Sequence, residues 1–387
     1  MLKKFAKVRR VLVMANVLAM LNLNIVFANE SVAKEPDVNA LSAILVDADT
    51  GRVLWGKDEN EPLPMASTTK IMTAIVVIEN CNLNEEVVVS KNAIKAPQVK
   101  MNLEAGEVIS VEQLLYALLM QSSNDAAVAL AEYVSGDVDK FCQLMTDRAR
   151  DIGCRDTIFE TPNGLDKGEH HSTAADLAII GAYAIKNKEF MRISNTNNIT
   201  YKTNKKTYNI TNKNQLLSSY DGGIGIKTGF TGKAGHCFVG AAKRGDITFI
   251  SVVLASGWGS AGKTRKWTDT NKILNYGFDN YKKYSIMGEN TNINVANAKV
   301  DKVTLEYEAP IELLLTEEEK KLVRFEANLP TYIEAPVRTG QAIGEGTVYI
   351  GDSIVANLDL VATEDIQRHC LSYSYEKIIG QWFRVLC

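Results

Sequence analysis

Three kinds of functional signature are missing from this sequence of 387 residues. The formal net charge of −3 leaves no basic excess, so the chain lacks the electrostatic footprint of a nucleic-acid-binding protein. It contains no glycine-rich loop of the Walker or Rossmann type, and its cysteines and histidines lack zinc-site spacing. These absences direct the search away from nucleic acids, nucleotides and zinc chemistry.

The six cysteines do not form a recognisable disulfide framework. Cys81, Cys142 and Cys237 lie in apolar surroundings and are typical of small core residues. Cys142 and Cys154 can pair only if the helix predicted between them ends suitably. We therefore favour free thiols over disulfide bridges.

The N-terminus has the pattern of an export signal. An apolar stretch over residues 11–27 follows a basic segment and ends at Val26-Phe27-Ala28, which fits a small-residue cleavage site. The basic side chains are those of Lys3, Lys4, Lys7, Arg9 and Arg10. We interpret residues 1–28 as a signal peptide. The alternative is an uncleaved membrane anchor, because the apolar stretch is close to the length that spans a bilayer.

Three short motifs occur in a fixed order along the chain. They are Ser67-Thr68-Thr69-Lys70, Ser122-Ser123-Asn124 and Lys227-Thr228-Gly229. Together they supply a nucleophile with a nearby amine, a second hydroxyl with an amide, and a cation beside a hydroxyl. These are the groups that acyl transfer through a serine requires.

Single motifs of this length also occur by chance, and the local context separates them. The other matches are Ser31 with Lys34, Ser260 with Lys263, Ser374 with Lys377, and Arg338-Thr339-Gly340. Only Ser67 opens a long apolar segment, over residues 71–78, and only Lys227 leads into two long strand-like runs. Ser260 is assigned to a glycine-rich loop. Context therefore selects Ser67 and Lys227.

The periodicity predicts an α/β domain with one mainly antiparallel sheet flanked by helices, followed by a small all-β domain. Predicted strands of the first domain cover residues 43–46, 53–55, 236–242 and 247–255. Predicted helices begin at Ser67, after a Ser110–Gln113 capping box, at Asp125, at Val138, after Thr173 and at Thr268. Strand-like runs of the second domain cover residues 303–307, 311–315, 322–327, 348–350 and 354–358.

The chain is accordingly divided into four parts. Residues 1–28 are the signal peptide, 29–285 the catalytic domain, 286–365 a sandwich-like β domain, and 366–387 an amphipathic tail. Apolar residues of this tail recur at helical spacing, which is typical of an interfacial helix at a membrane. The alternative is a helix that docks on the β domain. The tail is too short to span a bilayer.

The spacing of Ser67 and Lys70 places both side chains on one face of a helix. A serine hydroxyl needs a base, and Lys70 can act as that base only when it is neutral. Burial and a neighbouring cation such as Lys227 would both lower its pKa. The alternative for Ser67 is a helix cap, a position that serine often takes.

The other two motifs can supply proton transfer and binding. Ser122 can relay a proton, and Asn124 can hold a peptide amide through its paired donor and acceptor. Lys227 and Thr228 can bind a carboxylate. The alternatives are a loop between two helices for the Ser122 motif and a solvated strand edge for the Lys227 motif.

Longer segments around the motifs resemble the serine D-alanyl-D-alanine carboxypeptidases, the low-molecular-weight penicillin-binding proteins of peptidase family S11. The matching segments are residues 64–74, 121–127, 161–165, 171–174, 225–231 and 234–237. The resemblance covers residues 39–281 and continues, less specifically, to the end of the chain. It implies a penicillin-binding, β-lactamase-like transpeptidase fold, and we assign His170 and His171 a structural role near a helix start.

The resemblance implies an acyl-enzyme on Ser67, with Lys70 as base and Ser122 as proton relay. The backbone N–H groups of Ser67 and Phe230 would form the oxyanion hole. The residues implied in substrate binding are Asn124, Lys227, Thr228, Gly229 and Phe230. The implied substrates are peptidoglycan stem peptides that end in D-Ala-D-Ala, and β-lactams would acylate Ser67. No metal or organic cofactor is implied, and an exported enzyme would sit on the outer face of the cytoplasmic membrane through its tail.

Two other functions remain open. A class A β-lactamase shares the first and third motifs but needs a deacylating glutamate, for which Glu169 is in the relevant stretch. A non-catalytic wall-binding or penicillin-sensing module would keep the cleft without turnover. Endopeptidase action on cross-links is a lesser possibility with the same site.

Overall fold

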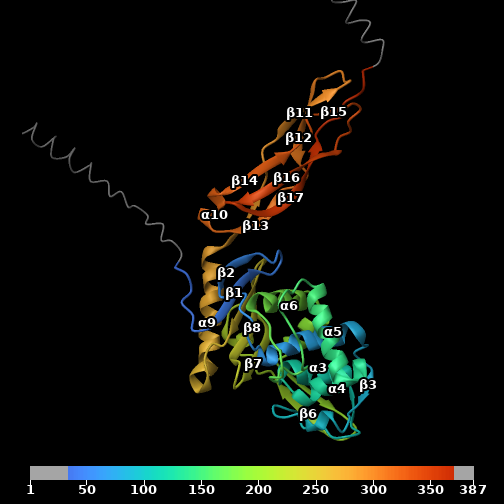
Figure 1. The fold of residues 1–387 in the computed structure, drawn as a ribbon, viewed down its shortest axis with the longest axis vertical. Coiled ribbons are helices and arrows are strands. Elements are labelled where there is room, and N and C mark those ends of the chain that lie inside the picture. The colour runs from blue at the N-terminus through green and yellow to red at the C-terminus, as the bar shows by residue number, and fades with distance from the viewer. Residues whose placement is uncertain (1–33, 370–387) are drawn as a thin grey trace, which may run out of the picture. The chain divides into compact units, whose positions relative to one another are not determined.

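The computed structural model describes residues 34–369, which form two groups of elements (Figure 1). The first group comprises β1 Ser42–Asp47, β2 Val53–Lys57, the 3-10 helix η1 Ala66–Thr69, α2 Lys70–Asn80, β3 Glu86–Val88, the 3-10 helix η2 Ala93–Lys95, β4 Val108–Ser110, α3 Val111–Met120, α4 Asn124–Ser135, α5 Val138–Asp151, α6 Ala174–Lys186, α7 Lys188–Ser194, β5 Asn198–Lys202, β6 Thr207–Thr211, α8 Leu216–Ser219, β7 Gly223–Thr231, β8 Gly235–Arg244, β9 Ile247–Leu254 and α9 Gly259–Asn280.

The second group consists almost entirely of strands. It comprises β10 Lys282–Ile286, β11 Thr291–Ala296, β12 Lys302–Tyr307, β13 Ile311–Leu315, α10 Glu317–Lys321, β14 Val323–Asn328, β15 Tyr332–Glu334, β16 Ala342–Ile350 and β17 Ser353–Ala362.

A five-stranded antiparallel sheet organises the first group, in the order β2-β1-β9-β8-β7. Its two faces belong to different hydrophobic clusters. Helices α2, α6 and α7 contact one face, and α3, α4 and α5 pack on α2. Helix α9 covers the other face (Figure 1). This arrangement agrees with the predicted α/β fold and its mainly antiparallel sheet.

Local sequence signals set several helix starts. Ser110 and Gln113 form the predicted capping box at the start of α3, and Thr173 accepts a hydrogen bond from the backbone of Asp176 at the start of α6. Helix α9, however, begins at Gly259 and not at Thr268. Its first turns are mostly exposed and polar, so they lack the apolar period that reveals a helix. The assignment of Ser260 to a loop was therefore wrong.

The second group forms a six-stranded sheet in the order β14-β16-β17-β12-β11-β15 and a two-stranded sheet of β10 and β13. Leu313 and Leu315 of the small sheet pack on Val348 of the large one, as expected for a sandwich-like domain. The five predicted runs correspond to β12, β13, β14, β16 and β17. The other strands, β10, β11 and β15, escaped detection because polar or exposed residues dominate them.

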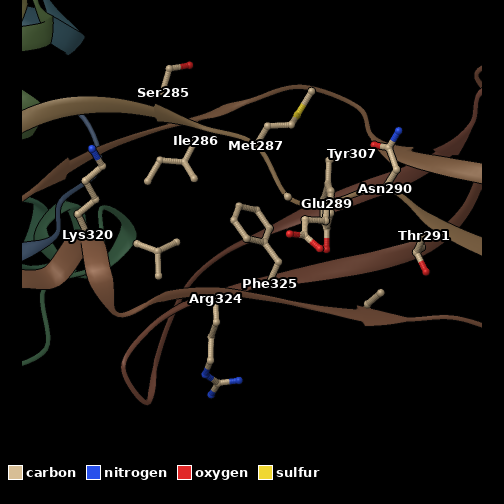
Figure 2. Close-up of a pocket in the computed structure, with 13 residues that line it drawn as sticks. Ser285, Ile286, Met287, Glu289, Asn290, Thr291, Tyr307, Lys320, Arg324 and Phe325 are labelled. Atoms are coloured by element: carbon tan, nitrogen blue, oxygen red, sulfur yellow. The ribbon is translucent and has the colours of Figure 1, made fainter.

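A pocket of about 700 Å³ lies in this second group, between the β10–β11 connection and the edge strand β14 (Figure 2). Tyr307 and Phe325 form its floor, with their ring centroids 5.0 Å apart. Lys320 and Arg324 stand at its border. Its volume falls in the range of small-molecule sites, so volume alone would favour this pocket over the motif residues as the place of function.

Four cysteines lie in the described part of the chain, and all four are free thiols: Cys81, Cys142, Cys154 and Cys237. Between residues 34 and 369, no helix has the length and apolar character needed to cross a membrane. The predicted signal peptide lies outside the described residues, as does the helical part of the predicted tail.

Candidate active site

Ser67 is presented by the short helix η1, immediately before the buried helix α2. The hydroxyls of Thr68 and Thr69 donate back to the carbonyls of Met65 and Ala66, at 2.6 and 2.8 Å. Both threonines are buried, whereas Ser67 is partly exposed. The turn therefore fixes Thr68 and Thr69 in place and leaves the Ser67 hydroxyl accessible.

Lys70 opens α2 and makes three short polar contacts through its Nζ. Ser67 Oγ lies at 2.8 Å, Asn124 Oδ1 at 2.8 Å and the carbonyl oxygen of Asn163 at 2.5 Å. Two of these partners can only accept hydrogen bonds, whereas the serine hydroxyl can also donate. A neutral amine has two N–H donors and one lone pair. In this arrangement Lys70 Nζ donates to Ser67 Oγ, and the Ser67 hydroxyl donates to the carbonyl oxygen of Asn163 at 3.3 Å. A neutral Lys70 could reverse the first bond and accept the Ser67 proton.

Burial favours this neutral form. Lys70 has no solvent-exposed surface, and burial holds its pKa well below the usual value of 10.5. The positive charge of Lys227 lowers the pKa further, while Asp125 opposes the shift. Two motifs far apart in the sequence thus converge on one amine.

The second motif lies at the junction of α3 and α4. Asn124 uses Oδ1 for Lys70 and donates from Nδ2 to the carbonyl of Pro97 at 3.0 Å. It therefore orients the lysine, in addition to any contact with substrate. Ser122 has a left-handed backbone with φ of 66°, and among residues 34–369 its hydroxyl has no hydrogen-bond partner. The structure brings Asn124 to Lys70 but leaves Ser122 unbonded.

The third motif lies on β7, which is an edge strand of the five-stranded sheet. Lys227 is 2 % exposed, and burial, followed by the charges of Lys213 and Lys266, lowers its pKa to about 7. Its Nζ donates to the carbonyl of Thr228 at 2.9 Å. A Cβ at Gly229 would lie 3.0 Å from the backbone nitrogen of Ser67. Glycine therefore allows β7 to approach Ser67 closely.

The loop between α5 and α6 supplies the Asn163 carbonyl. Thr73 of α2 donates to the carbonyl of Pro162 at 2.6 Å, which ties this loop to the helix of Lys70. Gly164 has φ of 83°, and a Cβ there would lie 2.0 Å from the carbonyl oxygen of Ala66. Only glycine fits this contact.

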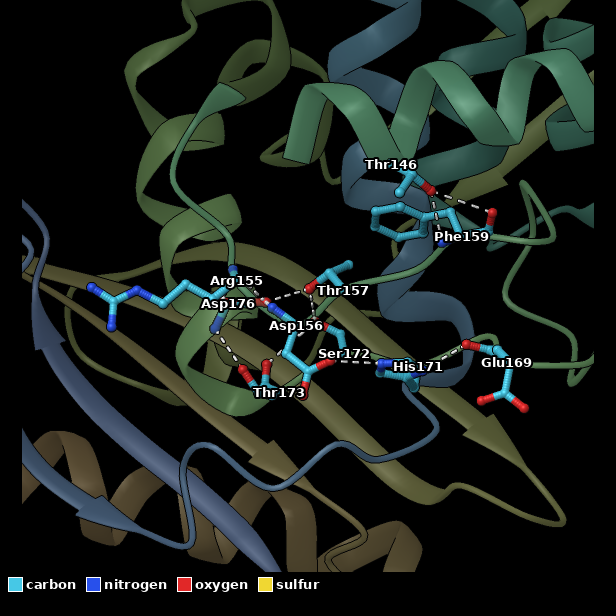
Figure 3. A network of polar contacts seen from close by, with 10 residues as sticks. All are labelled: Thr146, Arg155, Asp156, Thr157, Phe159, Glu169, His171, Ser172, Thr173 and Asp176. Atoms are coloured by element: carbon cyan, nitrogen blue, oxygen red, sulfur yellow. Dashed lines mark hydrogen bonds and ion pairs between the residues drawn. The ribbon is translucent and has the colours of Figure 1, made fainter. Parts of the chain in front are cut away.

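A polar network anchors the base of the same loop (Figure 3). The carboxylate of Asp176 accepts from the backbone nitrogens of Arg155 and Asp156 and from the hydroxyl of Thr157. His171 joins the network through Asp156, at 3.0 Å, and through the carbonyl of Glu169. The network holds both ends of the loop, so the Asn163 carbonyl can be positioned accurately.

His170 has the structural surroundings expected for it. Its Nδ1 accepts from the backbone nitrogen of Glu160 at 3.0 Å, so Nε2–H donates to Thr69 Oγ1 at 2.9 Å. Burial lowers its pKa to about 4, and nearby His171 and Lys70 act in the same direction. His170 is therefore neutral and supports the turn that carries Ser67.

Two contributors were missed by sequence reasoning. Asn163 acts through its backbone carbonyl, which leaves no side-chain signature in a sequence. Lys213 follows the β5–β6 hairpin, in a polar stretch where a lysine carries no local signal. Its Nζ donates to the carbonyl of Gln121 at 3.4 Å, and its charge acts on Lys227.

The assembled site combines a hydroxyl, a buried amine whose pKa is lowered, and a cluster of lysines suited to a substrate carboxylate. Among residues 34–369, no group of three or more His, Cys, Asp or Glu side chains is placed to hold a metal ion. The chemistry available from the side chains themselves is nucleophilic acyl transfer.

Comparison with known proteins agrees with this chemistry. The family described as D-alanyl-D-alanine carboxypeptidase matches residues 29–257, and the family described as penicillin-binding protein 5, C-terminal domain, matches residues 279–368. D-alanyl-D-alanine carboxypeptidase DacF of Bacillus subtilis is 31 % identical over 356 residues, covering 89 % of this chain and 90 % of DacF. The D-alanyl-D-alanine carboxypeptidase of Streptomyces sp. K15 is 37 % identical over 262 residues, covering 63 % of this chain and 89 % of its own.

Solved structures are similar over most of the chain. Penicillin-binding protein 5 of Haemophilus influenzae aligns with a TM-score of 0.71 and 28 % identity, over 87 % of this chain and 99 % of its own. The D-alanyl-D-alanine carboxypeptidase DacD of Francisella tularensis aligns with a TM-score of 0.69 and 26 % identity, over 88 % of this chain and 98 % of its own. The similarity includes both groups of elements.

Proposed function

The chain belongs to the D-alanyl-D-alanine carboxypeptidase family, and from that premise we propose that it removes the terminal D-alanine from peptidoglycan stem peptides through an acyl-enzyme on Ser67. The observation that carries the assignment of Ser67 is its 2.8 Å contact with the buried amine of Lys70. Burial and the charge of Lys227 hold the pKa of that amine well below 10.5, which supports a role as the base.

The reaction has two halves. Ser67 Oγ attacks the carbonyl carbon of the penultimate D-alanine, and its proton passes to Lys70 Nζ. The amide bond then breaks, and the departing nitrogen of D-alanine takes up the proton, with Ser122 as the relay. Water next attacks the Ser67 ester, Lys70 accepts a proton from that water, and the shortened peptide leaves as Ser67 regains its proton.

Binding follows from the remaining motif residues. Lys227 and Thr228 hold the terminal carboxylate, and Asn124 contacts the substrate backbone. The backbone N–H groups of Ser67 and Phe230 stabilise the oxyanion. The close approach of Gly229 to the backbone of Ser67 supports this arrangement, because it brings the two N–H groups to one side of the cleft. β-Lactams would enter as covalent inhibitors of Ser67.

A class A β-lactamase mechanism is less well supported. Glu169 is exposed, and its backbone, not its carboxylate, joins the network around His171 (Figure 3). The groups that contact Lys70 are Ser67, Asn124 and Asn163, with no carboxylate among them. The covalent penicillin adduct is therefore expected to hydrolyse slowly, in contrast to the rapid penicillin hydrolysis of a β-lactamase.

Intact-mass measurement with and without penicillin tests the proposal, together with D-alanine release from an acylated tripeptide ending in D-Ala-D-Ala. We expect one covalent penicillin adduct per chain in the wild type and none in Ser67→Ala. The wild type should also release one D-alanine for each peptide that it cleaves. Labelling that survives in Ser67→Ala would show that another serine reacts. Labelling without D-alanine release would favour a penicillin sensor.

We also propose that the protein is exported and held at the outer face of the cytoplasmic membrane by its C-terminal tail. The basic and apolar N-terminus and the amphipathic pattern of residues 375–386 support this. Removal of residues 375–387 should move the protein from the membrane fraction to the soluble fraction. Unchanged partition would contradict the anchoring role.

A further inference from the structure

Asp125 is a fully buried carboxylate one residue beyond the second motif, in the first turn of α4. Its Oδ1 accepts from the backbone nitrogens of Met101 at 3.1 Å and Ala126 at 3.0 Å, and its Oδ2 accepts from that of Leu103 at 3.0 Å. These bonds and the N-terminal end of the helix dipole offset the cost of burying a charge. All three donors are neutral backbone groups, so the bonds leave the negative charge of Asp125 unbalanced.

Asn124 and Asp125 fasten residues 97–103, here called the clamped segment, to the start of α4. Asn124 donates from Nδ2 to the carbonyl of Pro97 at 3.0 Å and from its backbone nitrogen to that of Val99 at 2.7 Å. Asp125 holds the other end of the segment through the segment nitrogens bonded to its carboxylate. Consecutive residues of α4 therefore hold both ends of the clamped segment.

The clamped segment and Lys70 share one side chain, the amide of Asn124. Its Nδ2 bonds the segment, and its Oδ1 lies 2.8 Å from Lys70 Nζ. A shift of the segment would therefore turn the amide away from the amine. The hydrogen bonds of Lys70 go to Ser67, Asn124 and Asn163, so Asp125 acts on this amine by charge and not by contact.

Titratable side chains from β7, α4 and the α5–α6 loop act on Lys70. Lys227 disfavours the protonated amine, whereas Asp125 favours it. His170 is neutral, because burial lowers its pKa to about 4. Buried tyrosines of the β5–β6 hairpin also interact with Asp125, and burial keeps them neutral by raising the pKa of each: Tyr201 and Tyr208. Asp125 is therefore the negative charge in this group.

We propose that Asp125 is a positioning residue for acyl transfer: its carboxylate holds the clamped segment against α4, which keeps Asn124 on Lys70, and its negative charge acts on that amine. This inference rests on the proposed function, because it concerns the base of the same reaction. Asp125 touches no reacting atom and works through Asn124 and Lys70. The carboxylate thereby couples the geometry of the second motif to the protonation of the base.

The rate of penicillin acylation as a function of pH tests both effects in two variants. Asp125→Asn removes the charge, so Lys70 should lose its proton more readily and the midpoint of the rising limb should move to a lower pH. It also places an NH₂ group against backbone donors, so the rate reached at high pH should fall by about ten- to hundredfold. Asp125→Glu keeps the charge at a different length. It should lower the high-pH rate but leave the midpoint near that of the wild type.

Asp269→Asn is the matched control. Asp269 is also fully buried, and its carboxylate accepts from the backbone nitrogens of Asn39 and Ala40, at 3.1 Å each. It lies on α9, which covers the other face of the sheet. The same substitution at this position should leave both the midpoint and the high-pH rate of acylation unchanged.

An unchanged midpoint or an unchanged high-pH rate in Asp125→Asn would overturn the proposal, as would an equal shift of the midpoint in Asp125→Glu or Asp269→Asn. If Asp125→Asn does not fold, hydrogen exchange of the wild type decides. The amides of Met101 and Leu103 should exchange slowly, and rapid exchange would overturn the clamp. A wild type that neither labels with penicillin nor releases D-alanine would instead contradict the proposed function.

Discussion

The motif cleft and the pocket of the β region differ in how their polar groups are used. In the cleft, Lys70 and Lys227 are almost fully buried, and burial lowers the pKa of each. In the pocket, Lys320 Nζ lies 4.2 Å from the centre of the Tyr284 ring, and Arg324 pairs with Glu326 at an exposed surface. The pocket offers volume, whereas the cleft offers oriented, desolvated amines.

The difference shows why volume alone is a poor guide to a reactive site. A buried amine without a carboxylate partner destabilises the fold, so its retention requires another reason. The exposed cations of the pocket are solvated or paired and carry no comparable cost. A reactive site is therefore expected where the fold keeps buried amines that have no carboxylate partner. The following substitutions test this difference between the cleft and the pocket.

The largest effect is expected from Lys70→Met. This change keeps an unbranched side chain of similar length but removes the base, so acylation by penicillin should slow by about 10²- to 10⁴-fold. Stopped-flow or quenched-flow labelling measures the rate. The matched control is Lys320→Met in the pocket, which should label at the wild-type rate. Equal rates for the two variants would contradict the contrast between the regions.

Lys227→Met should slow acylation and at the same time stabilise the folded protein. Acylation should slow because the cation proposed to bind the substrate carboxylate is lost, while the free energy of unfolding should rise by about 2–4 kcal/mol at pH 7 or below. The sign follows from a pKa of about 7 in the folded state against 10.5 unfolded. Below pH 7 the amine is charged in both the folded and the unfolded state, so its burial destabilises the fold by the full amount. Between pH 7 and 10.5 this destabilisation decreases as the pH rises, and above pH 10.5 it is absent.

Urea unfolding of wild type and Lys227→Met at several pH values measures this gain. The stability difference should be greatest in acid and should disappear above pH 10.5. A difference that is independent of pH would show that packing, and not the buried charge, accounts for it.

The smallest effect is expected from Arg324→Ala. The side chain is exposed, lies 3.7 Å from the centre of the Tyr349 ring and pairs with Glu326, so its loss should cost less than about 1 kcal/mol. Penicillin labelling should be unchanged. A large loss of labelling would show that the pocket contributes to the reaction.

The sequence predicted the groups that local spacing controls. Ser67 and Lys70 are three residues apart and meet as expected, and the Ser110 and Thr173 caps begin their helices where predicted. The convergence of Lys227 on Lys70 depends on tertiary packing, and only the order of the motifs indicated it. The Asn163 carbonyl is a backbone atom, so no residue pattern could identify it.

Polar, exposed segments concealed other features. Lys213 follows a hairpin rich in asparagine, threonine and lysine, where one more lysine carries no signal. The early turns of α9 and the short strands β10, β11 and β15 lack a buried face with regular period, so pattern reasoning could not locate them.

The central claim is that a neutral Lys70 activates Ser67, and the pH dependence of penicillin acylation tests it most directly. We predict that the second-order acylation rate rises with pH along a limb centred far below 10.5, the ordinary value for lysine, because burial and Lys227 hold the pKa of Lys70 down. A limb centred near 10.5, or a rate that does not change with pH, would contradict the account.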